Sequence, residues 1–207
     1  MDTNPAPHQS VRQQSEASTI TAHRLDAVLG DLADLLETIP GSADTDPTPC
    51  TEYDTATLRR HVVGWLTAFA DGFSSPNGRC SDFDVVTVEG TGAEQVRTAA
   101  GRLTNVLPEA ATRPLFIGEA SLPGDMALSM ILWEYQMHGW DLAVATGRPW
   151  APAEDGLLAS LDFAPAMLTP DFQGPGRPFA PAVDVPADSP VLDRLLGLSG
   201  RDPHWTP

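Results

Sequence analysis

Four long segments with helical hydrophobic periodicity limit most strongly what this chain can fold into. In each segment, apolar residues recur every three or four positions, whereas no stretch shows the spacing of a parallel sheet. The first stripe runs from Ile20 to Ile39 and stops at Pro40-Gly41. Because amphipathic helices bury their apolar stripes against one another, the pattern predicts an all-α fold, a four-helix bundle.

Residues that begin or end helices mark the other elements. Asp54 is a suitable N-cap for a second helix over residues 55–73, and a third is expected over about 93–107. The fourth and longest is expected from about Gly124 to Thr146, because Gly147 and Pro149 then follow in a common helix-stop arrangement. A shorter helix is expected over residues 154–168.

The two ends of the chain differ from the predicted bundle. Residues 1–17 contain Pro, Gln and Ser without periodicity, which predicts a disordered leader before a single domain over residues 18–207. From about residue 169 the chain is rich in Pro and Gly and contains one short helical segment, PVLDRLLGLSG. This C-terminal extension is expected to lie across the bundle, with four docking residues: Leu192, Leu195, Leu196 and Trp205.

Charge and composition exclude several classes of partner. The net charge is −16 and all 12 basic residues are arginine. So acidic a chain is not expected to bind nucleic acid or an anionic membrane surface. No run approaches the roughly 18 apolar residues of a membrane span, and the N-terminus lacks the apolar core of a signal peptide. We therefore expect a cytoplasmic protein whose cysteines, Cys50 and Cys80, are reduced. The arginine-only usage, with abundant Ala, Asp, Pro and Gly, suggests a high-GC genome of the actinobacterial type.

A polar stripe interrupts the apolar fourth helix. Glu134, His138 and Asp141 stand at positions i, i+4 and i+7, so a helix projects all three side chains the same way. Polar groups on a core-facing helix surface either pair with one another or bind something else. The stripe is therefore either an internal ion pair or part of a binding site.

His61, on the apolar face of the second helix, could add a third donor to Glu134 and His138. Two imidazoles and a carboxylate suit Zn²⁺, Fe²⁺, Ni²⁺ or Mn²⁺, and three protein ligands leave a coordination position open, as in catalytic sites. Asp141 would then hold a ligating imidazole or a bound water. A Glu and a His four residues apart are common in helices, however, and on spacing alone an ion pair is the commoner outcome.

Other reactive side chains are weaker candidates. Cys50, in TPCTEY before the second helix, could be a nucleophile, but a small buried packing residue is favoured. Arg59 and Arg60 could bind a substrate carboxylate, although a solvated helix face is the more common environment for such residues. The same two alternatives apply to Arg148 and Arg177.

Three segments resemble one family, the DinB-like helical bundles that include mycothiol-dependent maleylpyruvate isomerase, and especially its short actinobacterial metal-binding relatives. They are TPCTEYDTATLRRHVVGW, LPGDMALSMILWEYQMHGWDLAVATGRP and LDRLLGLSGRDPHW, and the resemblance covers most of residues 20–205. The central segment is similar to the family's H-G-W-D-L-A-x-A-T-G signature. Tyr53 stands where the family commonly has Trp, and the isomerase's separate C-terminal domain is not evident here.

The resemblance implies an up-down bundle with a crossover and a divalent metal, usually zinc, held by His61, Glu134 and His138. It also implies a thiol cosubstrate such as mycothiol, whose metal-activated thiolate attacks a small electrophilic substrate in a transfer or an isomerisation. Two alternatives stay open: hydrolysis at the same metal without a thiol, and a bundle that binds metal or ligand without catalysis. A homodimer is expected, since such bundles often dimerise.

Overall fold

The computed structural model describes residues 7–177 and 179–207, with side chains from residue 13 onward. Its helices are α1 (Pro7–Thr38), α2 (Thr55–Ser74), α3 (Ala93–Val106), α4 (Gly124–Ala145), α5 (Glu154–Met167) and α6 (Val191–Leu198). A two-stranded hairpin, β1 (Leu115–Ile117) and β2 (Ala120–Leu122), precedes α4. The predicted all-α class is confirmed. None of the described helices is long and apolar enough to cross a membrane.

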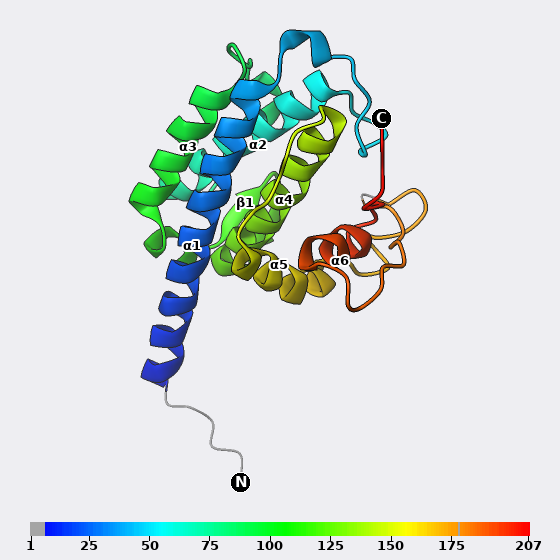
Figure 1. Ribbon diagram of the computed structural model, residues 1–207. Coiled ribbons are helices and arrows are strands. Elements are labelled where there is room, and N and C mark those ends of the chain that lie inside the picture. Colours follow the sequence, from blue (N-terminus) through cyan, green and yellow to red (C-terminus); the bar gives the residue numbers. More distant parts are fainter. Residues whose placement is uncertain (1–6, 178) are drawn as a thin grey trace.

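Helices α1 to α4 pack around one apolar core. Helix α1 lies against α3 and α4, and α2 packs against the same two helices (Figure 1). Helices α1, α2 and α3 each contribute an apolar stripe, whereas α4 is apolar on most of its surface and packs against α1, α2 and α5. Fully buried side chains of this core include Leu29, Leu32 and Leu36 of α1, Leu58, Leu66 and Phe69 of α2, Val96 and Leu103 of α3, and Leu128, Ile131 and Tyr135 of α4.

The helix boundaries follow the local signals in the sequence. Asp54 caps α2, since its carboxylate accepts a hydrogen bond from the Thr57 amide at 2.8 Å. Helix α4 ends at Ala145 and is followed by Gly147 with φ of +65°, a backbone conformation that glycine adopts without steric cost. The expected third and fifth helices also end within one residue of their predicted limits.

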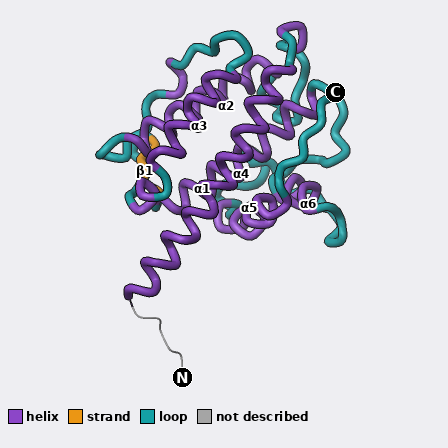
Figure 2. Tube along the Cα trace, turned by 60° about the vertical axis from the view of Figure 1, so that its left-hand side comes forward, coloured by secondary structure: helices purple, strands orange, loops and turns teal. Residues whose placement is uncertain are grey.

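Helix α1 begins at Pro7, so the disordered leader expected over residues 1–17 is corrected for residues 7–17. Residues 1–6 lie outside the described part of the chain. The side chains of residues 13–17 are exposed, so this part of the helix has no apolar stripe from which to detect it. Its Gln, Glu and Ala residues are adequate helix formers, and proline is well tolerated in a first turn. The first turns of α1 extend beyond the other helices (Figure 2).

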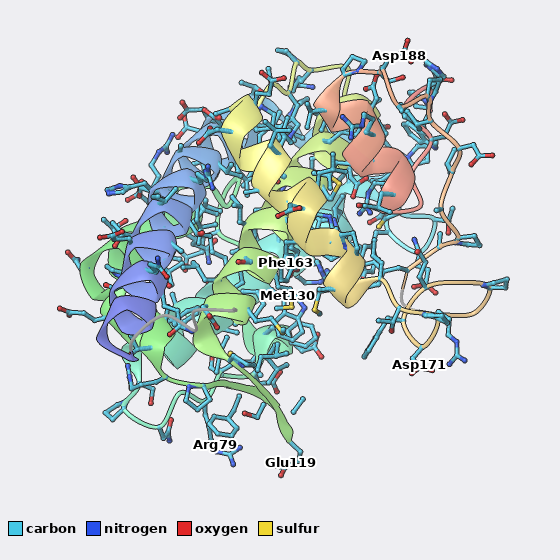
Figure 3. The ribbon with its side chains drawn as sticks, turned by 90° about the horizontal axis from the view of Figure 1, so that it is seen from below. Arg79, Glu119, Met130, Phe163, Asp171 and Asp188 are labelled. Carbon is cyan, nitrogen blue, oxygen red and sulfur yellow. The ribbon has the colours of Figure 1, made fainter. Side chains whose placement is uncertain are left out.

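The hairpin before α4 was not anticipated from the sequence. Strands β1 and β2 pair antiparallel, with Leu115 opposite Leu122 and Ile117 opposite Ala120. Each strand has three residues and only Leu115 is buried, so neither strand is long enough to show an alternating pattern. Figure 3 labels Arg79 and Glu119 at this edge of the molecule, and Asp171 and Asp188 at the edge formed by the C-terminal extension.

The C-terminal extension docks through a second apolar cluster. Helix α5 packs against α4, and α6 packs against α5. Leu195 and Leu196 are fully buried there, and Leu192 and Trp205 are partly buried in the same cluster, as expected from the sequence. The last residues lie beside the loop between α1 and α2 (Figures 1 and 2). This return of the chain brings the extension next to the N-terminal end of α2.

Candidate metal centre

Three side chains from two helices converge where α2 faces α4. His61 of α2 and Glu134 and His138 of α4 each offer one donor atom, and these atoms all lie within 4.8 Å of one another. His61 Nε2 is 3.6 Å from Glu134 Oε1, and the two imidazole centroids are 5.0 Å apart. The side chains of His61 and Glu134 are 19% and 22% exposed, so a small ligand can reach the cluster from solvent.

The alignment of α2 with α4 is fixed immediately beside this cluster. Tyr135, the neighbour of Glu134, is fully buried and donates a hydrogen bond from its hydroxyl to the carbonyl of Val62 at 3.2 Å. Val62 is in turn the neighbour of His61. Burial raises the pKa of Tyr135 well above its ordinary value, so the phenol stays a donor. The bond therefore sets the distance between the helix that carries His61 and the one that carries Glu134.

The donor set fits a divalent cation. Imidazole nitrogens and a carboxylate oxygen are ligands that zinc and similar metals bind at about 2.0–2.2 Å, which places tetrahedral donors roughly 3.4 Å apart. The separation of 3.6 Å between His61 and Glu134 is close to that value. The three residues could therefore hold a metal ion with at least one position left for another ligand.

Asp141 holds the far side of the His138 ring. Its Oδ2 lies 3.0 Å from His138 Nδ1, and the carboxylate is completely buried. Burial raises the pKa of Asp141, but the Arg201 charge and hydrogen bonds from Arg201 and His138 outweigh it, so the pKa lies below its usual value. An anionic Asp141 accepts a hydrogen bond from a protonated Nδ1, which leaves Nε2 of His138 available to a metal ion.

Arg201 is the residue of this centre that sequence reasoning missed. Its Nε and Nη2 donate to the two oxygens of Asp141 at 2.8 and 2.7 Å. Arg201 follows α6 in the irregular C-terminal extension, where no periodicity indicates which way a side chain points. The only sequence signal is its position in SGRDPHW, within a segment that resembles the DinB-like family.

Aromatic side chains flank His61. The Tyr53 hydroxyl lies 3.4 Å from His61 Nδ1, within hydrogen-bond distance, and Trp65 presents its edge to the imidazole one turn further along α2. Trp65 also stacks on Phe83, with ring centroids 4.1 Å apart. On α4, the partly buried Met130 lies one turn before Glu134 and is labelled in Figure 3. The donors thus have apolar neighbours on both helices.

Cys50 lies close to the centre, but its environment does not suit a nucleophile. Its Sγ is 3.9 Å from Arg201 Nη2, and it forms a second possible donor group with His138 and Asp141. Both oxygens of Asp141 already accept hydrogen bonds from Arg201, so the group with Glu134 is the better ligand set. Burial, with a contribution from Asp141, raises the pKa of Cys50 to about 11, so the thiol is protonated at neutral pH.

The arginines considered from the sequence lie elsewhere. Arg59 is buried and pairs with Asp44 at 3.1 Å, so the expectation of a solvated position is wrong for this residue. Arg60 is exposed, and its guanidinium lies 3.4 Å from the Thr57 hydroxyl. Arg148 donates to the Thr38 hydroxyl at 2.7 Å at the end of α1. Arg177 is exposed in the C-terminal extension.

An open cavity of about 470 Å³ lies beside the cluster. The loop between α1 and α2 forms most of its wall, and Trp205 of the C-terminal extension also lines it. Tyr53 both lines the cavity and contacts the ring of His61, a member of the candidate metal cluster. The polar and aromatic residues of the lining are Thr45, Thr48, Thr51, Glu52, Tyr53, Asp54 and Trp205.

Comparison with known proteins identifies relatives in an actinobacterium. The uncharacterized proteins MT0763 and Rv0738, from two strains of Mycobacterium tuberculosis, are each 30% identical to this chain over 162 residues. The aligned region covers 75% of this chain and 83% of each relative. No family model matches the chain, and no solved structure matches it. The chain belongs to the same family as these two mycobacterial proteins.

Proposed function

We propose that the protein is a divalent-metal-dependent enzyme of the thiol-transferase or isomerase type, acting on a small electrophilic substrate. The observation that carries this proposal is the convergence of His61, Glu134 and His138 in a cluster that is partly open to solvent. A purely structural zinc site is closed by four protein ligands, whereas a catalytic site keeps a position for water or substrate. Zinc is the metal that the family resemblance favours, and Ni²⁺, Fe²⁺ and Mn²⁺ suit the same donors.

The proposal includes membership of the DinB-like superfamily, as an up-down four-helix bundle with a crossover. The packing of α1 and α2 against both α3 and α4 supports it. So does the position of the resembling motifs: TPCTEYDTATLRRHVVGW enters the helix of His61, and HGWDLAVATG includes His138 and Asp141. Both motifs thus supply residues to one cluster.

The chain's own residues would orient the donors and leave space for a second reactant. Coordination of a low-molecular-weight thiol such as mycothiol would lower its pKa from about 8.5 and supply a thiolate at neutral pH. Asp141 fixes the His138 ring, and Tyr53 contacts the His61 ring on its Nδ1 side. Because Cys50 stays protonated, an exogenous thiol is the better source of the nucleophile.

Two further parts of the proposal concern the setting of the enzyme. Cys50 and Cys80 are both free, which suits the reducing cytoplasm that we propose as its compartment. A homodimer is the oligomeric state proposed from the family resemblance. Sedimentation of the purified protein would give a mass of one chain instead of two if that part is wrong.

A thiol-dependence assay tests the proposed reaction. The zinc-loaded protein would be mixed with an epoxide or an α,β-unsaturated carbonyl compound, with and without mycothiol. We expect turnover only with the thiol, and loss of turnover in Glu134→Gln but not in His23→Ala, which changes an exposed histidine of α1. The zinc-loaded protein would also be mixed with an ester. Turnover of the ester at the same rate with and without thiol would replace the proposal with hydrolysis. Absence of turnover of the electrophiles and of the ester would leave a metal-binding protein without catalysis.

A further inference from the structure

We propose that Arg201 is a positioning residue for the metal centre: it orients the Asp141 carboxylate, which in turn orients His138. The inference rests on the proposed metal site and assigns a role in it to the C-terminal extension. Arg201 follows α6 and lies 60 residues from Asp141 in sequence. The extension would thus contribute to metal binding without supplying a ligand.

Arg201 clamps the Asp141 carboxylate at both oxygens, and one of these oxygens also contacts His138. The planar guanidinium donates from Nε to Asp141 Oδ1 at 2.8 Å and from Nη2 to Oδ2 at 2.7 Å. Two parallel bonds fix the plane of the carboxylate, which a single charge contact does not. Oδ2 also lies 3.0 Å from His138 Nδ1. The orientation of the carboxylate therefore determines the orientation of the imidazole.

The clamp is shielded from bulk solvent. Asp141 is completely buried and the Arg201 side chain is 11% exposed. Removing Arg201 would leave the Asp141 carboxylate able to rotate about its side-chain bonds, with only His138 as a partner among the described residues. A rotated carboxylate would no longer select the His138 tautomer that carries its proton on Nδ1.

Helix α6 holds Arg201 in place. The Arg201 amide donates to the Leu196 carbonyl at 2.9 Å, and Leu196 is fully buried against the second apolar cluster. Ser199 links α6 to α4 directly, since Trp133 Nε1 donates to its hydroxyl at 3.0 Å. Arg201 is therefore anchored through backbone and packing contacts that do not involve Asp141.

A second arginine–aspartate pair, in which only the arginine is buried, shows what such a pair looks like without this role. Arg59 contacts Asp44 through one nitrogen at 3.1 Å, and Asp44 is 43% exposed. No histidine of the described chain shares that carboxylate. Arg201 differs because its partner carries a third bond, to a residue of the donor cluster.

The test compares Arg201→Gln, Arg201→Lys and Asp141→Asn with Arg177→Gln, an exposed arginine of the same extension. The first readout is the His138 tautomer in the metal-free protein, from long-range proton–nitrogen NMR correlations. The second is zinc affinity, from competition with a chromophoric chelator. Circular dichroism shows whether each variant is folded, and the charge-conserving lysine variant covers the case in which glutamine prevents folding.

We expect His138 to carry its proton on Nδ1 in the wild type and to populate both tautomers in Arg201→Gln. Zinc affinity should fall by about 10- to 100-fold in Arg201→Gln and Asp141→Asn, less in Arg201→Lys, and not at all in Arg177→Gln. The combined Arg201→Gln/Asp141→Asn variant should be no weaker than Asp141→Asn alone, because both act through one contact.

Folded Arg201 variants that keep the wild-type tautomer and zinc affinity within twofold would overturn the inference, whatever their thermal stability. Arg201 would then hold the extension only. The tautomer readout needs no metal, so it tests the positioning role even if the wild-type protein binds no zinc. In that event the proposed function fails, and the link from Arg201 to His138 is judged separately.

Discussion

Helix α4 has two faces that carry polar groups, and their environments differ. On one, which we call the site face, Glu134, His138 and Asp141 lie toward α2 and the C-terminal extension. On the other, the indole face, Gln136 and Gly139 lie toward Trp150 and α5. The site face leaves donor atoms accessible, whereas the indole face is closed by an aromatic ring. The same helix thus combines a face with candidate metal donors and a face used for packing.

The indole face explains the glycine of the HGWD motif. A Cβ atom placed on Gly139 would lie 2.1 Å from Cζ2 of Trp150, so only glycine lets the ring lie this close to the helix. Trp150 Nε1 also donates to the backbone carbonyl of Gln136 at 3.0 Å. Within HGWD, the histidine and the aspartate therefore belong to the site face, and the glycine between them belongs to packing.

This contrast predicts that changes on the site face affect metal binding, whereas changes on the indole face affect stability. Replacing His138 by alanine removes one of three donors and should weaken zinc binding by more than about 100-fold. Chelator competition measures the affinity, and His23→Ala, at an exposed position of α1, is the control. Zinc binding at wild-type strength in folded His138→Ala would remove this residue from the centre.

Gly139→Ala should have the next largest effect, and it should change stability instead of metal binding. Because the added methyl group overlaps the Trp150 ring, we expect a loss of about 1–3 kcal/mol in the free energy of unfolding, or several degrees in Tm. Zinc affinity should stay within twofold of wild type. Urea denaturation of the metal-free protein measures the loss, and an unchanged midpoint would show that Trp150 does not lie against this glycine.

Gln136→Leu should be close to neutral or slightly stabilising. The Gln136 side chain is fully buried, and its amide has no hydrogen-bond partner among the described residues. Replacing an unsatisfied buried amide by an apolar side chain of similar size removes a desolvation cost of about 1–3 kcal/mol. Thermal unfolding measures the change. A drop of several degrees would instead mean that the amide is satisfied by an internal water.

The smallest effect is expected for Cys50→Ser, which should leave zinc affinity within twofold of wild type. Burial raises the pKa of Cys50 to about 11, so the thiol of the metal-free protein is protonated at neutral pH, and His61, Glu134 and His138 already supply the donors of the proposed site. Alkylation of Cys50 by iodoacetamide should accordingly be slow at pH 8 and accelerate up to about pH 11. Rapid labelling at pH 8 that zinc suppresses would place Cys50 in the centre.

The sequence was most informative about residues of the core-forming helices. Periodicity predicted α2 and α4 within one or two residues and placed Glu134 and His138 on one stripe. That His61 lies beside that stripe depends on how two helices pack, and the spacing of the residues alone favoured an ion pair over a metal site. The structure brings the three side chains together, and whether they bind metal stays a prediction.

Contacts made by irregular segments could not be predicted in this way. Arg201 reaches Asp141 across 60 residues, and Trp150 reaches Gly139 from the loop after α4. Neither arginine nor tryptophan lies in a repeating pattern that indicates its partner. The burial of Arg59 escaped prediction for a related reason, because its partner Asp44 lies in the loop between α1 and α2. Such contacts arise from tertiary packing and require the folded chain.

The most direct test of the proposed centre is a measurement of metal content. The 207-residue chain would be purified without chelators and then reloaded with zinc. Inductively coupled plasma mass spectrometry of the wild type should give about one divalent metal per chain, because the three donors form a single site. Glu134→Ala, measured in parallel, should retain less than roughly a tenth of that amount if the carboxylate is a ligand. A wild-type protein without stoichiometric metal, or an unchanged content in folded Glu134→Ala, would contradict the assignment of His61, Glu134 and His138 as a metal site.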